Sequence, residues 1–329
     1  MKSKYIIGTL AILTVATFVF IFDNVFSIWE QASYARFRPV TTGLPSAQIA
    51  RDVQIGEVTA DIYTAPATAG AARPLLVVVH GGFLQGGNKK NYAYLGGLGV
   101  RNGYTVAIVQ LPHYPGIFTK FFFSAKGLAA RSLPAQAQNF AAFLNEVKQL
   151  GPKYGFDGER IHVLAHGSGA LLLGAADVKG YRSISLISPI FSLAKDVGKI
   201  APMQLRALDG YVKDADALKL SPSEWLKQTT NPVLIICGER DLPYIKDACK
   251  TAELSRPNTK PMNRIIVQRP SHFELMFHLG SKIEDATEPF KKFLFDNAKL
   301  CFIAPPRSGS AINFKAERLL VKACRSESF

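Results

Sequence analysis

A Gly-Ser-Gly run near the middle of the chain has the spacing of a turn that presents a catalytic nucleophile. Such a turn leads sharply from a strand into a helix and tolerates only small residues two positions either side of the nucleophile. Centred on Gly167, the flanking residues are Ala165 and Gly169, and both are small. Centred on Ser168, one flank is His166, whose ring is too large. The pattern therefore predicts a nucleophile turn with glycine at its apex.

The other parts of an acyl-transfer site follow further predicted strands. Asp241 comes just after an apolar run and His272 just after the last one, in the chain order nucleophile, acid, histidine. An acid that orients a histidine base belongs to this chemistry. Gly81 and Gly82 follow an earlier apolar run, where glycine lets backbone N–H groups approach a developing oxyanion.

Apolar runs alternate with helical patterns over most of the chain, which predicts a mostly parallel sheet covered by helices. The expected strands are 58–63, 74–79, 104–109, 161–165, 183–187, 233–237 and 265–268. The expected helices are 92–101, 135–150, 169–176, 246–254 and 288–297. Two insertions, 112–133 and 191–226, come after strand ends, where lids and substrate-binding loops are carried. The three phenylalanines at 121–123 fit a lid face, a membrane contact or simply core beneath the loop.

Several phrases together resemble the esterase/lipase branch of the α/β-hydrolase superfamily, near the hormone-sensitive-lipase-like carboxylesterases and kynurenine-formamidase-like esterases. They are Ala60-Asp61-Ile62-Tyr63, the glycine-rich run 80–87, the run 154–161, the turn itself, Ser221-Pro222, the run 232–241 and Ser271-His272-Phe273. The resemblance covers about residues 53–298 and implies an α/β-hydrolase fold with lid insertions. It also implies Asp241 and His272 as acid and base, and Gly81, Gly82 and Ser168 around the oxyanion hole.

The chain departs from that family at the nucleophile, because Gly167 stands where the family has serine. Ser168 is displaced by one residue, roughly 3.8 Å of chain, and misplacements near 1 Å already cost about a hundredfold in rate. Two hypotheses remain open. The first is a membrane-anchored hydrolase of small-molecule carboxylic esters with Ser168 as displaced nucleophile. The second is a catalytically inactive relative that binds a ligand or acts as a scaffold.

Residues 5–22 form an uncharged apolar run that is just long enough to cross a bilayer as a helix. Lys2 and Lys4 precede it, so the N-terminus is expected in the cytoplasm and the folded part on the exported side. The alternative is a secreted protein with a cleaved signal peptide. We expect an anchor at 1–23, a juxtamembrane linker at 24–52, the hydrolase domain at 53–298 and an extension at 299–329.

The net charge of +14 is spread along the chain rather than concentrated. For an exported domain without a recognition motif, nucleic acid is a poor partner, and anionic lipid headgroups fit a basic surface better. A generally basic, solvated surface without a specific partner explains the charge more simply than either. The four cysteines permit disulfides in an oxidising compartment. Cys301 and Cys324 are candidates to pair, Cys237 is expected as a buried free thiol, and Cys249 fits either state. No spacing suggests a metal, and no motif suggests a cofactor.

Overall fold

One mixed sheet organises the molecule. The computed structural model describes residues 2–39, 48–65, 72–82, 85–114, 122–193, 219–251, 262–280 and 283–298. The sheet has the strand order β1-β2-β4-β3-β5-β6-β7-β8. Its strands are β1 (Gln48–Ile55), β2 (Val58–Thr64), β3 (Arg73–Val79), β4 (Thr105–Gln110), β5 (Phe156–His166), β6 (Ser183–Ile187), β7 (Val233–Arg240) and β8 (Met262–Ser271). Strands β3 to β8 pair in parallel and β2 pairs antiparallel to β1 and β4, which confirms the predicted mostly parallel sheet.

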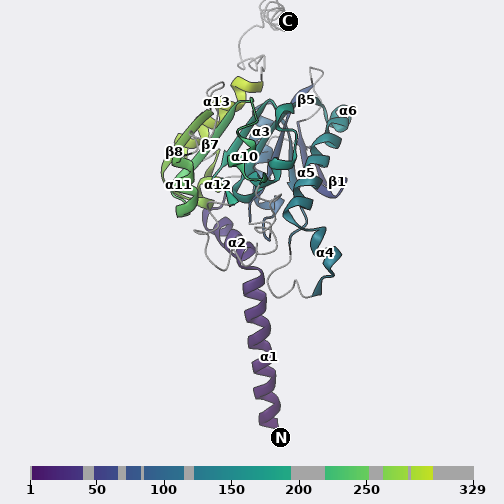
Figure 1. Ribbon diagram of the computed structural model, residues 1–329, viewed down its shortest axis with the longest axis vertical. Helices are drawn as coiled ribbons and strands as arrows, with labels where there is room; N and C mark the ends of the chain where they lie inside the picture. The colour runs from purple at the N-terminus through teal and green to yellow at the C-terminus, as the bar shows by residue number, and fades with distance from the viewer. Residues whose placement is uncertain are drawn as a thin grey trace, which may run out of the picture.

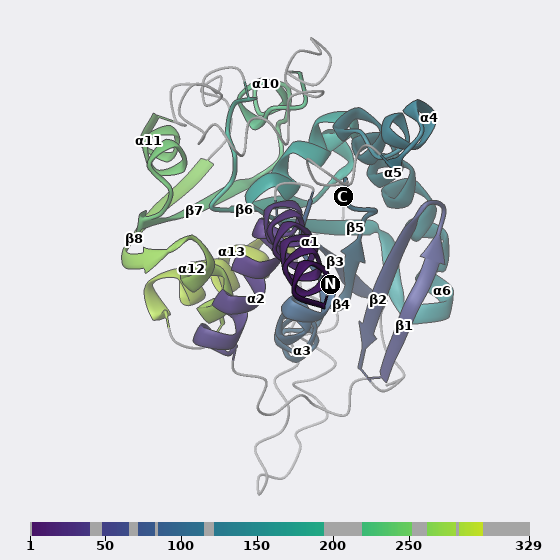
Figure 2. The same ribbon diagram turned by 90° about the horizontal axis from the view of Figure 1, so that it is seen from below.

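Helices cover both faces of this sheet (Figure 2). The α-helices are α1 (Lys2–Asp23), α2 (Val25–Phe37), α3 (Ala93–Arg101), α4 (Ala125–Ala129), α5 (Leu133–Glu146), α6 (Gly151–Tyr154), α10 (Pro222–Trp225), α11 (Pro243–Thr251), α12 (His272–His278) and α13 (Glu284–Ala298). The 3₁₀ helices are η1 (Lys89–Tyr92), η3 (Val147–Leu150), η4 (Gly167–Ala175) and η5 (Val178–Gly180). Helices α5, α10 and α11 lie on one face, and α2, α3 and α12 lie on the other.

The continuous apolar runs in the sequence arise because the central strands are buried on both sides. In β3, Val77 and Val79 belong to the core beneath α5, whereas Leu76 and Val78 belong to the core beneath α3 and α12. All four side chains are almost fully buried. A strand with this environment is apolar at every position. Its packing on both faces fixes where the strand ends and therefore where the following loop begins.

The strand order reverses at β3, and this reversal sets the position of the site. Strand β4 lies on one side of β3 and β5 lies on the other. The connections that leave β3 and β5 therefore run in opposite directions, and ligands of open α/β sheets bind in the crevice between such connections. The loop after β3 begins at His80 and the turn after β5 begins at Gly167. The predicted oxyanion loop and nucleophile turn are therefore neighbours.

Helix α1 projects away from the body of the molecule (Figure 1). It includes the helix predicted over 5–22, and large apolar side chains such as Leu13, Phe18 and Phe20 are exposed. In the part of the chain that the structure describes, none of the helices has the length and apolar character needed to span a bilayer. The transmembrane part of the sequence prediction is therefore without support from the fold.

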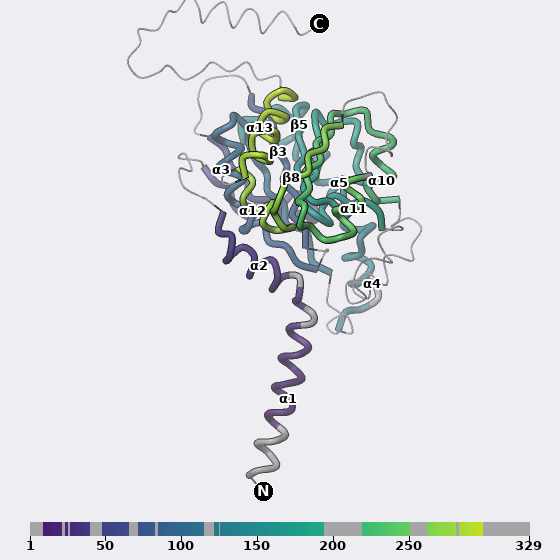
Figure 3. Tube along the Cα trace, turned by 90° about the vertical axis from the view of Figure 1, so that its left-hand side faces the viewer, coloured from purple at the N-terminus to yellow at the C-terminus, as the bar shows by residue number. Residues whose placement is uncertain are grey.

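The segment predicted as a linker, 24–52, instead contains helix α2 and the first half of β1. Figure 3 shows α2 following α1 and lying against the body beside α12. Tyr34 packs edge-on against Phe277 with ring centroids 5.5 Å apart, and the His278 ring donates to the carbonyl of Phe37 at 3.0 Å. The globular unit therefore extends N-terminal to residue 53. Sequence periodicity missed α2 because its buried contacts are few and depend on a distant helix.

The two predicted lid insertions are described only in part, since 115–121 and 194–218 lie outside the described residues. The first insertion includes the short helix α4, which lies toward the same end of the molecule as α1 in Figures 1 and 3. Phe122 is 87% exposed and the Arg131 guanidinium lies over the Phe123 ring, 5.4 Å from its centroid. Core burial, one of the three roles considered for these phenylalanines, does not apply to Phe122. The extension from 299 onward, with Cys301 and Cys324, also lies outside the described residues.

Candidate active site

Four loops that follow parallel strands bring the predicted site residues to one edge of the sheet. Gly81 and Gly82 follow β3, Gly167 follows β5, Asp241 follows β7 and His272 follows β8. Each position is fixed by the buried strand before it. The structure thus brings together the residues that the sequence singled out.

Gly167 occupies the apex of a tight turn, as the spacing predicted. Its φ of +53° lies in the left-handed region, which costs glycine little and other residues more. A Cβ atom added at this position would lie 3.3 Å from Nε2 of His272 and 3.7 Å from Cα of Gly81. A side chain at 167 would therefore point at the histidine across the oxyanion loop.

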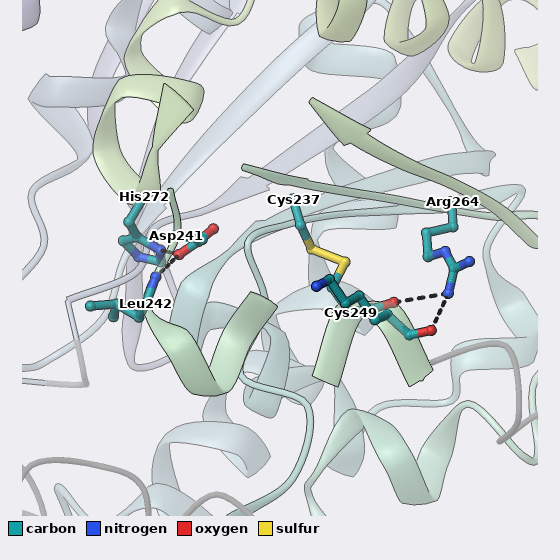
Figure 4. The surroundings of a disulfide bond; sticks show 7 residues. Cys237, Asp241, Leu242, Cys249, Arg264 and His272 are labelled. Carbon is teal, nitrogen blue, oxygen red and sulfur yellow. Dashed lines mark hydrogen bonds and ion pairs between the residues drawn. A yellow bond between two sulfur atoms is a disulfide. The ribbon is translucent and has the colours of Figure 1, made fainter. Parts of the chain in front are cut away.

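His272 and Asp241 form a buried hydrogen-bonded pair. The ring Nδ1 donates to Oδ1 of Asp241 at 2.9 Å, and the backbone N–H of Leu242 donates to the same oxygen at 2.8 Å (Figure 4). Burial pushes the pKa of the Asp241 carboxyl upward. The charge of His272 and the hydrogen bonds from His272 and Leu242 outweigh burial and hold that pKa below its usual value. The carboxylate is therefore ionised at neutral pH. In the tautomer that donates from Nδ1, the lone pair of the imidazole is on Nε2, which faces position 167.

A disulfide joins the strand before Asp241 to the helix after it. Cys237 in β7 is bonded to Cys249 in α11, with Cα atoms 6.6 Å apart and 12 residues of separation (Figure 4). The prediction that Cys237 is a free thiol is therefore wrong, because α11 folds back onto β7 and brings Cys249 within bonding range. Closing a loop of this length stabilises the fold by roughly 3 kcal/mol, and the loop includes Asp241.

The oxyanion loop and the turn pack backbone against backbone. A Cβ on Gly169 would lie 2.6 Å from the carbonyl oxygen of His80, and a Cβ on Gly82, whose φ is +98°, would lie 2.4 Å from the backbone of Gly86. Only glycine fits at these contacts. The N–H of Gly81 points to the Tyr92 hydroxyl at 3.4 Å. Gly82, in contrast, lines the cavity beside His272.

Ser168 is the second residue of helix η4 and its side chain is buried, with 2% of the residue exposed. Its Oγ makes no hydrogen bond to any described residue, His272 included. Ser168 nonetheless lines the same cavity as Gly167 and His272. Its role as a displaced nucleophile, and the role of its N–H in an oxyanion hole, stay predictions.

The cavity beside His272 is small and is covered by helix α2. It encloses about 10 Å³, room for little more than one water molecule. The Trp29 ring stacks on the His272 ring with centroids 6.2 Å apart and an angle of 21°, and meets Phe273 edge-on at 4.9 Å. The cavity walls are Trp29, Gly82, Gly167, Ser168, Ile190, Ile245, His272 and Phe273. No signal in the sequence indicated that Trp29 lies against His272, because that contact depends on how α2 packs on the body.

Glu30, next to Trp29, carries a carboxylate into the same region. Only 1% of the residue is exposed, and its Oε1 accepts hydrogen bonds from the Asn88 N–H at 3.2 Å and the Asn91 side chain at 2.7 Å. Burial raises the pKa of Glu30 to about 7, although both hydrogen bonds and the charge of His272 oppose this rise. Docking of α2 on the body therefore depends on the protonation of Glu30.

The remaining histidines near the site are buried and lack the geometry of a metal centre. His166 Nδ1 is hydrogen-bonded to the Tyr92 hydroxyl at 2.8 Å, and burial holds the pKa of His166 well below its ordinary value. His162, inside β5, bonds Ser183 at 2.8 Å. Within the described ranges, no group of three or more histidine, cysteine or acidic side chains could hold a metal ion.

Comparison with known proteins places the fold among esterases of known structure. An inhibited form of esterase B from Lactobacillus rhamnosis superimposes with a TM-score of 0.62, at 17% identity over 89% of this chain and 97% of that chain. A hyperthermophilic esterase from Pyrobaculum calidifontis gives 0.60, at 18% identity over 85% and 93%. A thermostable esterase from Pseudomonas putida gives 0.60, at 18% identity over 83% and 89%. No family model and no curated protein matches the sequence. The likeness shows that this chain has the α/β-hydrolase fold, as predicted.

Glu30 should make the stability of the protein fall as pH rises. The folded state binds the Glu30 proton more tightly than the unfolded state does. The resulting stability is fully present below pH 4.5, the ordinary pKa of a glutamate, and is lost as pH rises through about 7. Between pH 5 and pH 8 we expect a loss of about 2–3 kcal/mol in the free energy of unfolding, measured by urea titration.

Glu30→Gln should remove this loss, because the amide oxygen still accepts both hydrogen bonds but carries no charge. Glu57→Gln, at an exposed carboxylate, serves as the matched control and should keep the wild-type slope. Equal pH dependence in wild type and Glu30→Gln would contradict the assignment.

Proposed function

We propose that the protein hydrolyses small-molecule carboxylic esters, with His272 as general base and Asp241 as the residue that orients it. The observation that carries this proposal is that Nε2 of His272 faces residue 167 while Nδ1 is hydrogen-bonded to Asp241. Nε2 of His272 lies 3.3 Å from the place of a Cβ at residue 167, and its other nitrogen is held by Asp241 at 2.9 Å. A histidine held in this way takes a proton from an attacking hydroxyl group and returns it to the leaving group.

The negative charge that develops on the ester carbonyl requires N–H donors opposite the base. Gly82 and Ser168 line the cavity, and the N–H of Ser168 is at the start of η4, where helical N–H groups lack intrahelical partners. These two N–H groups supply the oxyanion hole in this proposal. Gly81 positions the loop and contributes its own N–H if Tyr92 releases it. No metal or cofactor enters the scheme.

The second candidate is a catalytically inactive protein that uses the same fold for binding or as a scaffold. The observation that favours it is the cover on the site, because Trp29 leaves only about 10 Å³ beside His272. An ester therefore reaches the base only if Trp29 or the whole of α2 moves. Hydrolysis remains the better-supported function, since an inactive protein has no need of an ionised Asp241 aimed through His272 at a vacant apex.

Removal of His272 tests the proposal. His272→Ala should lower the hydrolysis of 4-nitrophenyl acetate by about 10²–10⁴, the usual contribution of a general base. The matched control is His278→Gln, at the other end of α12, which retains a donor to the Phe37 carbonyl and should keep wild-type activity. Equal rates in wild type and His272→Ala would remove the enzymatic proposal and leave the inactive candidate.

For the location of the protein, we propose association of α1 with a lipid bilayer and a position of the body on the exported side. The exposed apolar side chains of α1 support the first part, since a helix that is apolar all round is normally buried in protein or lipid. The Cys237–Cys249 disulfide supports the second, since disulfides persist in oxidising compartments. Secretion after cleavage of the N-terminal segment is the alternative.

Flotation with phosphatidylcholine vesicles tests the lipid association. The wild-type chain should float with the vesicles, and the double variant Ile12→Lys/Phe18→Lys should stay in the dense fractions, because each lysine would have to enter the hydrocarbon layer. The control Gln54→Lys/Gln228→Lys adds the same charge at exposed positions of the body and should float. Flotation of both variants would show that α1 does not contact lipid.

A further inference from the structure

We propose that the attacking nucleophile is a water molecule seated at the apex of the turn, between His272 Nε2 and Ser168 Oγ, and that hydrolysis proceeds without an acyl-enzyme. This inference rests on the proposed ester hydrolysis and changes its chemistry. Ser168 becomes a residue that positions water rather than one that forms a covalent bond.

Gly167 places no side chain between the backbone of the turn and the His272 imidazole. A Cβ there would lie 3.3 Å from Nε2 and 3.5 Å from Cε1 of His272. Gly167 and His272 line the same cavity, and a water oxygen held there in van der Waals contact with the glycine meets Nε2 at about 3 Å, the reach required of a general base. The positive φ of +53° directs this space at the imidazole. The turn therefore offers the base a small nucleophile without supplying one from the chain.

The cavity has the size and the polar groups that a single water requires. Its volume of about 10 Å³ corresponds to one water, and a stable buried water needs two to four polar partners. Nε2 of His272 accepts one hydrogen bond, and Ser168 lines the same cavity. That hydroxyl is buried and has no hydrogen-bond partner among the described residues. A water in this position satisfies an otherwise unpaired buried group, which is costly to leave unpaired.

Ser168 itself is poorly placed to attack. Its hydroxyl makes no hydrogen bond to His272. The next residue of the turn, Gly169, packs so closely against His80 that a Cβ added to Gly169 would lie 2.6 Å from the His80 carbonyl oxygen. Moving the Ser168 hydroxyl to the apex would require a shift of the turn that this contact opposes. The base faces residue 167, whereas the serine is at residue 168.

The reaction is a single displacement. The water oxygen forms a bond to the ester carbonyl carbon while one water proton passes to His272 Nε2, and the carbonyl electron pair moves to oxygen. The N–H groups of Gly82 and Ser168 stabilise that oxyanion. When the carbonyl re-forms, the bond to the leaving alkoxy oxygen breaks and that oxygen takes the proton from Nε2. The products are the carboxylic acid and the alcohol, and His272 returns to its neutral state.

Partition with hydroxylamine during turnover distinguishes the two chemistries. Phenyl acetate and 4-nitrophenyl acetate would give one common acetyl-enzyme, so a covalent route requires the same ratio of acetohydroxamate to acetate from both esters. Direct attack by water has no common intermediate, so we expect the ratio to differ between the two esters. Gly167→Ser, which places a hydroxyl at the apex, is the matched control and should give one common ratio.

The Ser168 variant supplies the second readout. Ser168→Ala should retain turnover that depends on His272, with kcat lowered roughly tenfold for the loss of one hydrogen bond to the water and KM unchanged. A common ratio in the wild type, or loss of all His272-dependent turnover in Ser168→Ala, would overturn the water mechanism while leaving ester hydrolysis standing. If His272→Ala matches the wild type, both the function and the mechanism fail.

Discussion

The left-handed turn at Gly167 is the constraint on which the site depends. Its φ of +53° ends β5 abruptly and sends the chain into η4, and the close contact of Gly169 with the His80 carbonyl fixes the turn against the oxyanion loop. These contacts hold the apex open toward His272. The Asp241 hydrogen bond then fixes the tautomer of that ring. The turn thus directs a residue without a side chain at the imidazole.

A second interaction controls access to this geometry. Trp29 stacks on His272, and Glu30 is buried beside it with a pKa raised to about 7. Protonation of Glu30 favours the docked helix, so α2 covers the base more firmly in acid than in alkali. The same helix connects the body to the exposed apolar α1 (Figure 1). Helix α2 therefore connects the projecting helix α1 to the residue that covers His272.

The positions of the residues that follow buried strands could be predicted from local sequence patterns alone. Asp241, His272 and Gly82 could be predicted because the carboxyl ends of parallel strands meet at one edge, and the small flanks of Gly167 fixed the register of the turn. Trp29 and Glu30 could not be predicted, because their contacts depend on how α2 folds back onto α12, and no periodicity in 24–52 reports that contact. The Cys237–Cys249 bond was missed for a similar reason, since it depends on the packing of α11 against β7. The sequence predicted which residues stand at the ends of strands. It did not predict how helices α2 and α11 pack on the rest of the fold.

The most direct test of the central claim, that residue 167 faces the dyad across the oxyanion loop, is the crystal structure of Gly167→Ser after reaction with a small fluorophosphonate. Gly180→Ser, at an open position with no neighbour within 4 Å of an added Cβ, is the control and should not react. The account predicts phosphorus on the introduced hydroxyl, with a phosphonyl oxygen about 3 Å from the N–H groups of Gly82 and Ser168. An unmodified protein, or phosphorus bound to Ser168, would contradict it.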